Sequence, residues 1–153
     1  MTESKIPSEL PDWIRDHVKL YLEDPDKGRM WDSTPAGGPG VLACLLLSTR
    51  GRKTGNRSTL PLLYGEAGGA FVIIASKGGA PAHPAWYLNL MAEPECEIQV
   101  GRDHHKVKAR VAEGEERAKL WHLMEDIYPP YNDYQAATER QIPVVVLDPI
   151  TSD

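Results

Sequence analysis

Basic side chains crowd one short turn of this chain. Four of them fall within eight positions: Arg50, Arg52, Lys53 and Arg57. No acidic residue lies nearby in the sequence to offset their mutual repulsion. Glycines in the same turn can expose backbone N–H groups, which together with the cationic side chains make an anion-binding nest. The turn therefore predicts a bound anion, and solvated surface charges are the alternative. A nucleotide P-loop is excluded because Arg52 stands where that motif needs glycine.

A second cationic loop follows in the stretch "ASKGGAPAHPAWYLN", residues 75–89. Lys77 precedes two glycines, and a helix is predicted to begin near Pro84. Free N–H groups at a helix N-terminus favour anions. Two cationic, glycine-rich loops at the ends of consecutive strands predict one extended anionic ligand, for which a phosphate-bearing cofactor is the natural class. The alternative for this stretch is a plain strand–loop–helix connection.

Three tyrosines recur at intervals of three in "IYPPYNDYQ": Tyr128, Tyr131 and Tyr134. Tyrosine combines an apolar ring with an O–H donor, so such a row can form the wall of an apolar pocket. Packing at the edge of the core is the alternative reading of the same row. The five histidines show no metal-ligand spacing, so the sequence predicts no metal. No G-x-S-x-G nucleophile motif is present either.

Composition and charge narrow the class of protein. The chain has 153 residues and a net charge of -5, which argues against a general nucleic-acid binder. Residues 33–91 nevertheless carry five basic residues against one acid, a surplus of +4. A localised positive field suits a discrete anionic ligand. Two cysteines and an N-terminus without an apolar signal segment favour a reducing, cytoplasmic setting.

The elements that must position these residues follow from the apolar pattern. We expect a first helix over residues 7–24 and further helices over 84–93, 114–128 and within 129–140. Six strands are predicted over 41–49, 58–65, 70–76, 96–101, 105–113 and 142–149, with residues 66–69 forming a hairpin turn. Consecutive strands without intervening helices favour an antiparallel barrel or curled sheet over a doubly wound fold. We expect one domain over residues 1–153.

Together these stretches resemble the deazaflavin-dependent nitroreductase family, whose members use reduced coenzyme F420. The resemblance covers residues 42–149 and is carried by "GRKTG", "ASKGGAPAHPAWYLNL", "YPPYNDYQ" and "IPVVVLDP". It implies a split β-barrel of the flavin-reductase type, α+β or mainly β, with about six antiparallel strands and peripheral helices. It also explains the basic turn, because F420 carries a phosphate and an anionic polyglutamate tail.

The resemblance also implies roles for individual residues. Those expected at the cofactor are Arg52, Lys53, Arg57, Pro61, Ala75, Ser76, Lys77, Gly78, Gly79, Trp86 and Asn89. Those expected at the substrate are Leu63, Tyr128, Tyr131 and Tyr134. Ser76, Tyr131 and Tyr134 are the expected catalytic donors to the substrate oxygen.

Two positions depart from the family pattern. The family places an arginine where this chain has Ser58, and Arg57 precedes it by one residue. In an extended strand a shift by one residue reverses the side chain's face. The nitroreductase that names the family has tyrosine where Leu63 stands, so its substrate range does not carry over.

The expected activity is hydride transfer from reduced F420 to quinones, activated alkenes such as enones and lactones, or nitroaromatics. A flavin mononucleotide-dependent reductase and a non-catalytic F420-binding protein are the alternatives. The first helix is amphipathic, with Trp13 and Tyr21 near its apolar side. We expect this helix to pack on the barrel, to cover the site, or to make peripheral contact between a cytoplasmic protein and a membrane surface.

Overall fold

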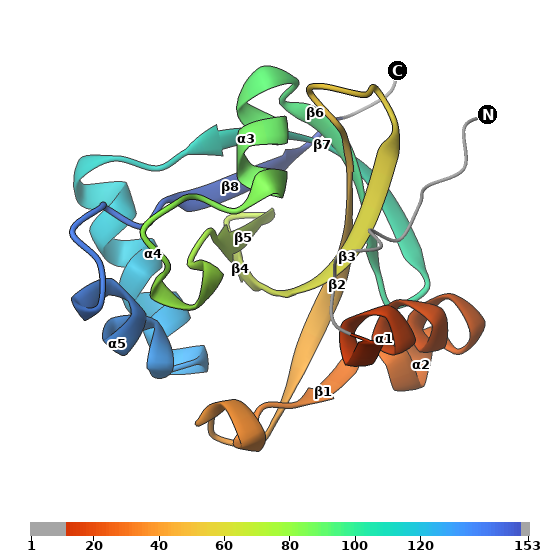
Figure 1. The fold of residues 1–153 in the computed structure, drawn as a ribbon, viewed down its shortest axis with the longest axis horizontal. Helices are drawn as coiled ribbons and strands as arrows, with labels where there is room; N and C mark the ends of the chain where they lie inside the picture. Colours follow the sequence, from red (N-terminus) through yellow and green to blue (C-terminus); the bar gives the residue numbers. More distant parts are fainter. Residues whose placement is uncertain (1–11, 151–153) are drawn as a thin grey trace.

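The computed structural model describes residues 12–150 and consists of one curled antiparallel sheet with helices at its sides (Figure 1). Its strands are β1 Met30–Asp32, β2 Val41–Arg50, β3 Arg57–Leu63, β4 Gly65–Ala67, β5 Ala70–Ile74, β6 Glu95–Val100, β7 Asp103–Val111 and β8 Val144–Pro149. The strand order is β1-β2-β6-β7-β8-β5-β4, and β3, which is not part of this path, pairs antiparallel with β2. The prediction of a split-barrel-like α+β fold is confirmed.

Five α-helices and two short 3-10 helices connect the strands within the described residues. They are α1 Asp12–Glu23, α2 Pro25–Gly28, η1 Thr34–Ala36, η2 Lys77–Gly79, α3 Ala85–Ala92, α4 Gly114–Ile127 and α5 Pro130–Ala136. Figure 1 shows α1 and α2 at one side of the sheet and α4 and α5 at the opposite side. None of the helices in residues 12–150 is long and apolar enough to cross a membrane.

All six predicted strands are present, with bounds within two residues of those expected, but the sheet has eight strands. The two missed strands, β1 and β4, have three residues each and are too short for a periodic signal. Residues 66–69 were predicted as a turn only; the structure places Glu66 and Ala67 in β4 and keeps the turn at Gly68 and Gly69. Residues 7–11 of the predicted first helix lie outside the described residues, and the single-domain assignment for residues 1–153 stays a prediction.

The long apolar runs of the sequence belong to strands that are buried on both faces. Along β8, Val144 and Val146 pack in one hydrophobic cluster, while Val145 and Leu147 pack in a second cluster on the other face. Because strand side chains alternate between faces, only a sheet covered on both sides buries four consecutive apolar residues. The first cluster contains the tyrosine row, and the second contains Trp86.

Helix α1 is fixed to the sheet by Tyr21, whose side chain is fully buried. The Tyr21 hydroxyl lies 2.9 Å from the carbonyl oxygen of Cys44 and accepts a hydrogen bond from the Gly101 N–H at 2.7 Å. Gly28 packs so closely that a Cβ there would lie 2.2 Å from the Tyr21 Cα. Burial raises the Tyr21 pKa to about 12, so the phenol keeps its proton. These contacts confirm that the first helix packs on the barrel.

Candidate active site

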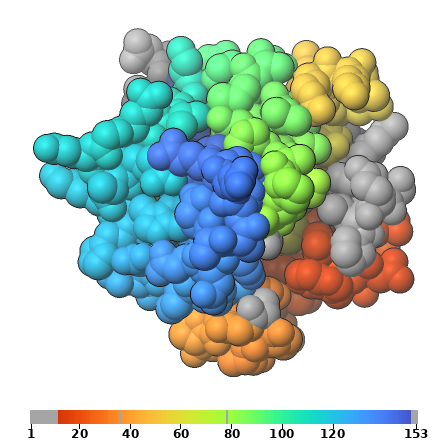
Figure 2. Space-filling view, turned by 60° about the vertical axis from the view of Figure 1, so that its left-hand side comes forward, coloured from red at the N-terminus to blue at the C-terminus, as the bar shows by residue number. Residues whose placement is uncertain are grey.

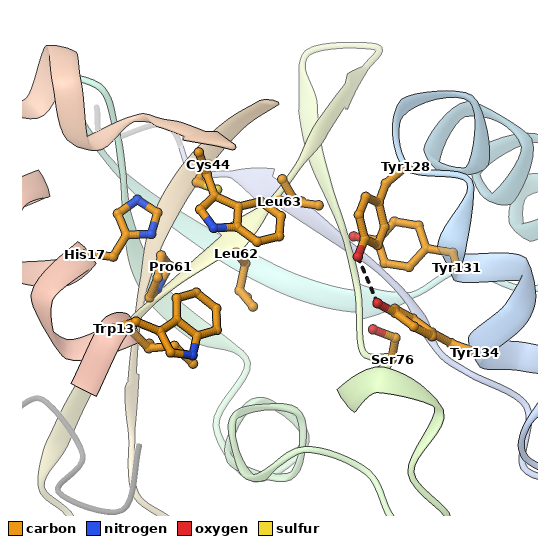
Figure 3. Close-up of a pocket in the computed structure, with 12 residues that line it drawn as sticks. Trp13, His17, Cys44, Pro61, Leu62, Leu63, Ser76, Tyr128, Tyr131 and Tyr134 are labelled. Atoms are coloured by element: carbon orange, nitrogen blue, oxygen red, sulfur yellow. Dashed lines mark hydrogen bonds between the residues drawn. The ribbon is translucent and has the colours of Figure 1, made fainter. Parts of the chain in front are cut away.

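An apolar cavity of about 350 Å³ opens between α1 on one side and α5 on the other (Figure 3). The side chains around it are Trp13, Ile14, His17, Trp31, Cys44, Pro61, Leu62, Leu63, Ser76, Tyr128, Tyr131 and Tyr134. Six of these twelve were predicted as site residues from the sequence: Pro61, Leu63, Ser76 and the three tyrosines. A volume of this size is at the small end of the range found for ligand pockets.

The tyrosine row forms one wall of the cavity. Pro129 and Pro130 end α4 and begin α5, which turns Tyr128, Tyr131 and Tyr134 toward one another. The Tyr128 and Tyr134 hydroxyls share a hydrogen bond of 2.8 Å. Within residues 12–150 the structure gives the Tyr131 hydroxyl no hydrogen-bond partner. Figure 3 shows all three phenol oxygens on the same side as the Ser76 hydroxyl.

Burial fixes the ionisation of this wall. It raises the pKa of Tyr128 and Tyr131 well above the usual value for a phenol. Both side chains therefore remain neutral and can donate hydrogen bonds. Cys44 also lines the cavity, and burial raises its pKa to about 12. Its sulfur is accordingly a neutral thiol that contributes apolar surface.

Helix α1 supplies the opposite wall with Trp13, Ile14 and His17. The imidazole Nε2 of His17 lies 2.6 Å from the Gly28 carbonyl oxygen, which can only accept, so Nε2 carries the proton. The indole ring of Trp13 stacks on Trp31 with ring centroids 6.3 Å apart. The prediction that the first helix covers the site therefore agrees with the structure. Apart from Trp13, sequence reasoning had not singled out these side chains, because no local pattern connects α1 to α5.

The basic turn contains two kinds of arginine. Arg50 and Arg57 lie at the ends of β2 and β3 and pair with acids on neighbouring elements: Arg50 with Glu93 at 3.7 Å and Arg57 with Glu97 at 2.5 Å. No acid lies near these two arginines in the sequence, but the fold brings one to each, so their charges do not require a bound anion. The Arg57 side chain points toward Glu97 of β6, so the structure offers no support for its expected cofactor contact.

Arg52 and Lys53 lie between those strand ends and are exposed. Asn89 of α3 holds the turn in place: its Oδ1 accepts from the Arg52 backbone N–H at 3.2 Å and from Nη1 at 3.0 Å. The Asn89 amide nitrogen donates to the Thr49 hydroxyl at 3.3 Å. Asn89 was expected to bond the cofactor directly, whereas in the structure these contacts position the turn.

Trp86, the other residue expected from α3, is buried among Leu45, Leu90 and Ile98 in the second hydrophobic cluster. Ala75 is also fully buried in that cluster. Neither lines the tyrosine cavity, so the structure does not bring these two predicted site residues together with the tyrosines.

The second cationic loop lies between β5 and α3 and begins at Ser76. Lys77 is the one non-glycine residue with positive φ among the described residues, at 46°, and its side chain is exposed. Such a conformation is sparsely populated and occurs often at functional sites. Gly79 has a φ of 83°, and a Cβ there would lie 2.7 Å from the Tyr134 carbonyl oxygen. The close approach that Gly79 permits is therefore to α5, and it joins the cationic loop to the tyrosine wall.

Comparison with known proteins gives this arrangement a family. The model of the F420H(2)-dependent quinone reductase family matches residues 13–149. An F420H(2)-dependent quinone reductase of Mycobacterium tuberculosis is 44% identical over 146 residues, which cover 88% of this chain and 95% of that protein.

Two solved structures are also similar. An F420-H2 dependent reductase has 42% sequence identity and a TM-score of 0.64, over 69% of this chain and 93% of that one. A structure described as a domain-swapped dimer has 36% identity and a TM-score of 0.66, over 90% and 98% of the two chains. The family match and these similarities confirm the F420-dependent resemblance, and the chain belongs to the F420H(2)-dependent quinone reductase family.

Proposed function

We propose that the protein is an oxidoreductase that reduces quinones at the tyrosine cavity with F420H2 as the hydride donor. The observation that carries this proposal is the placement of one apolar cavity, with a neutral tyrosine wall, directly beside the cationic loop at Ser76 and Lys77. A flat conjugated ring fits apolar walls, and an anionic cofactor fits cationic loops. Family membership supports the same pairing of donor and acceptor.

The cations present fit the proposed cofactor. Arg52, Lys53 and Lys77 form no ion pair with a carboxylate in the part of the chain that the structure describes. They are therefore available to a phosphate or a carboxylate tail, for which charge-assisted hydrogen bonds are the strong type. We assign these three residues to the anionic portion of F420, and Pro61 and Ser76 to the boundary between cofactor and substrate. Gly78 remains a proposed cofactor-binding residue on the resemblance alone. Arg57 is not assigned to the cofactor, because Glu97 neutralises its charge.

When bound, F420H2 supplies a hydride. The residues of this chain bind the acceptor and stabilise the charge that develops on its oxygen. Hydrogen-bond donors aimed at that oxygen lower the barrier because they strengthen as its charge grows. Tyr131 is the best placed donor, since its hydroxyl has no partner within residues 12–150, and Ser76 and Tyr134 are the others. Leu63 and the rings of Trp13 and Tyr128 exclude water from the reacting atoms.

One assay tests the proposal and separates its alternatives. Purified protein is mixed with F420H2 and menadione, and cofactor oxidation is followed optically, with enone, lactone and nitroaromatic acceptors in parallel. Turnover with menadione supports the proposal. Binding of F420 without turnover of any acceptor would indicate a cofactor-binding protein, and turnover with reduced flavin mononucleotide alone would indicate a flavin enzyme.

A second proposal concerns the apolar side chains of α1 that are exposed. Leu20 and Leu22 are 41% and 57% exposed, and Trp13 is 56% exposed. These side chains suit peripheral contact of a cytoplasmic enzyme with a lipid surface that carries its quinone. Because α1 also carries Asp12, Asp16 and Glu23, we expect neutral vesicles to bind better than anionic ones. Co-sedimentation with both vesicle types decides, and a Leu20→Ser/Leu22→Ser variant that pellets like the parent removes the proposal.

A further inference from the structure

Arg140, in the connection between α5 and β8, holds the cationic loop from behind. Its Nε donates to the Ala80 carbonyl oxygen at 2.8 Å, and its Nη2 donates to the Ser76 carbonyl oxygen at 2.7 Å. Nη1 lies 3.2 Å from the Ala75 carbonyl oxygen and 2.9 Å from His83 Nδ1. One planar guanidinium thus bonds both ends of the loop that carries Lys77. Figure 2 shows the two segments side by side, blue for residues near 140 and green for the loop.

The same connection is tied to the tyrosine wall. Gln135 of α5 donates from its amide nitrogen to the Arg140 carbonyl oxygen at 2.8 Å and accepts from the Ile142 N–H at 2.9 Å. Gly79 packs on Tyr134 of the same helix. The loop, Arg140 and α5 therefore form one hydrogen-bonded unit that fixes Ser76 relative to the tyrosines.

Charge gives Arg140 a second effect on the loop. The partners named above are neutral, and no carboxylate pairs with Arg140 within the described range of 12–150. An arginine keeps its proton in proteins, so a positive charge remains directly behind Ser76 and near Lys77. A partly buried charge is screened less by salt than an exposed lysine is.

We propose that Arg140 is a positioning residue for the reaction: it holds the Ser76–Ala80 loop in the strained conformation that presents Lys77 and the Ser76 hydroxyl to cofactor and substrate. This inference rests on the proposed function. It adds a residue that does not line the tyrosine cavity and acts through the loop. Arg140→Gln removes the charge and most of the N–H donors of the guanidinium. Arg140→Lys keeps the charge but loses the planar arrangement of the donors.

The test compares both variants with Arg110→Gln, which changes an arginine that pairs with Glu116 and Asp148 and does not line the cavity. We expect Arg140→Gln to weaken F420 binding at least about tenfold and to lower kcat with menadione. We expect Arg140→Lys to recover part of the affinity but little of kcat. Arg110→Gln should change neither. Wild-type affinity and kcat per folded molecule in Arg140→Gln, with only a lower Tm, would overturn the inference.

Hydrogen exchange decides the case without any cofactor. The Gly79 N–H bonds the Ser76 carbonyl oxygen at 2.9 Å, and the Ala80 N–H bonds the Lys77 carbonyl oxygen at 3.1 Å. If Arg140 holds the loop, these two amides exchange faster in Arg140→Lys while those of β8 do not. Unchanged exchange overturns the inference even if Arg140→Gln does not fold. A wild-type protein that binds no F420 would instead refute the proposed function, and the exchange result would still stand.

Discussion

The tyrosine cavity and the basic turn are both rich in groups suited to a ligand, but they are built in opposite ways. The cavity places neutral phenols on buried rings whose positions are set by packing. The turn places full charges on side chains that are exposed, apart from the half-buried Arg57, and its cations differ in whether an acid faces them. Removing a buried donor leaves the substrate oxygen that it would bond unsatisfied in a site that excludes water. An exposed charge, by contrast, is screened by water. The cavity should therefore control the rate, and the turn should control affinity.

Tyr131→Phe should produce the largest effect. It removes one hydroxyl that has no partner within the described residues and keeps the buried ring. We expect kcat with menadione to fall by roughly 10–1,000-fold, because a donor to the developing oxyanion is lost. F420 affinity should stay within about twofold. Steady-state kinetics and a fluorescence titration on the same preparation measure both values.

A purely structural role for Tyr131 makes a different forecast. Activity per folded molecule would be unchanged, and only the melting temperature would fall. Normal kinetics in Tyr131→Phe, in Tyr134→Phe and in both combined with Ser76→Ala would show that these hydroxyls are not donors.

Lys77→Ala and Lys53→Ala should come next in size. Each removes an exposed cation without an ion-pair partner in residues 12–150, and we expect F420 affinity to fall by roughly 1.5 kcal/mol, about tenfold. Arg57→Ala is the matched control, because Glu97 already neutralises that charge, and it should change affinity by less than about threefold. A larger loss of F420 affinity in Arg57→Ala than in both lysine variants, titrated at fixed salt, would contradict this distinction between Arg57 and the two lysines.

Trp13→Ala tests the α1 wall with a smaller expected effect. The indole is 56% exposed, so truncation removes only part of the apolar surface that a quinone ring would cover. We expect KM for menadione to rise severalfold, by about 1 kcal/mol, with F420 affinity unchanged. An equal loss of F420 affinity would place the wall at the cofactor instead. Leu22→Ala is the control, because that side chain of α1 is exposed and does not line the cavity.

The smallest effect concerns pH and His83. Burial, and then the Arg140 charge, lower the pKa of His83 below its ordinary value of 6.5. As the pH falls below 6.5, the unfolded chain binds the proton before the native protein does. The contribution of neutral His83 to stability is therefore complete above pH 6.5 and declines below it. Protonation also removes Nδ1 as an acceptor for Arg140.

Thermal melts from pH 8 to 5 measure this trend. The acid-side loss of Tm should be shallower in His83→Asn, which cannot ionise. A parent and variant with parallel pH profiles would show that His83 does not contribute to the acid sensitivity of the loop.

The types of chemical group, and the helices and strands that carry them, were predictable from the sequence. Alternation and apolar runs located six strands, and Pro129-Pro130 located the break between α4 and α5. The family motifs identified the cofactor class, because "ASKGG" and the tyrosine row are local patterns that a single chain displays. These features depend on neighbours in the chain, so periodicity and composition are sufficient to find them.

Which of these groups face one another depends on the tertiary structure. Glu97 lies 40 positions from the Arg57 that it neutralises, and Arg140 lies 64 positions from the Ser76 carbonyl oxygen that it holds. His17 and Trp13 share a cavity with Tyr131 only because α1 packs on β3 while α5 packs on the loop that contains η2. Side-chain pairing depends on strand register and on the curl of the sheet, which are properties of the assembled fold and not of any short stretch of sequence.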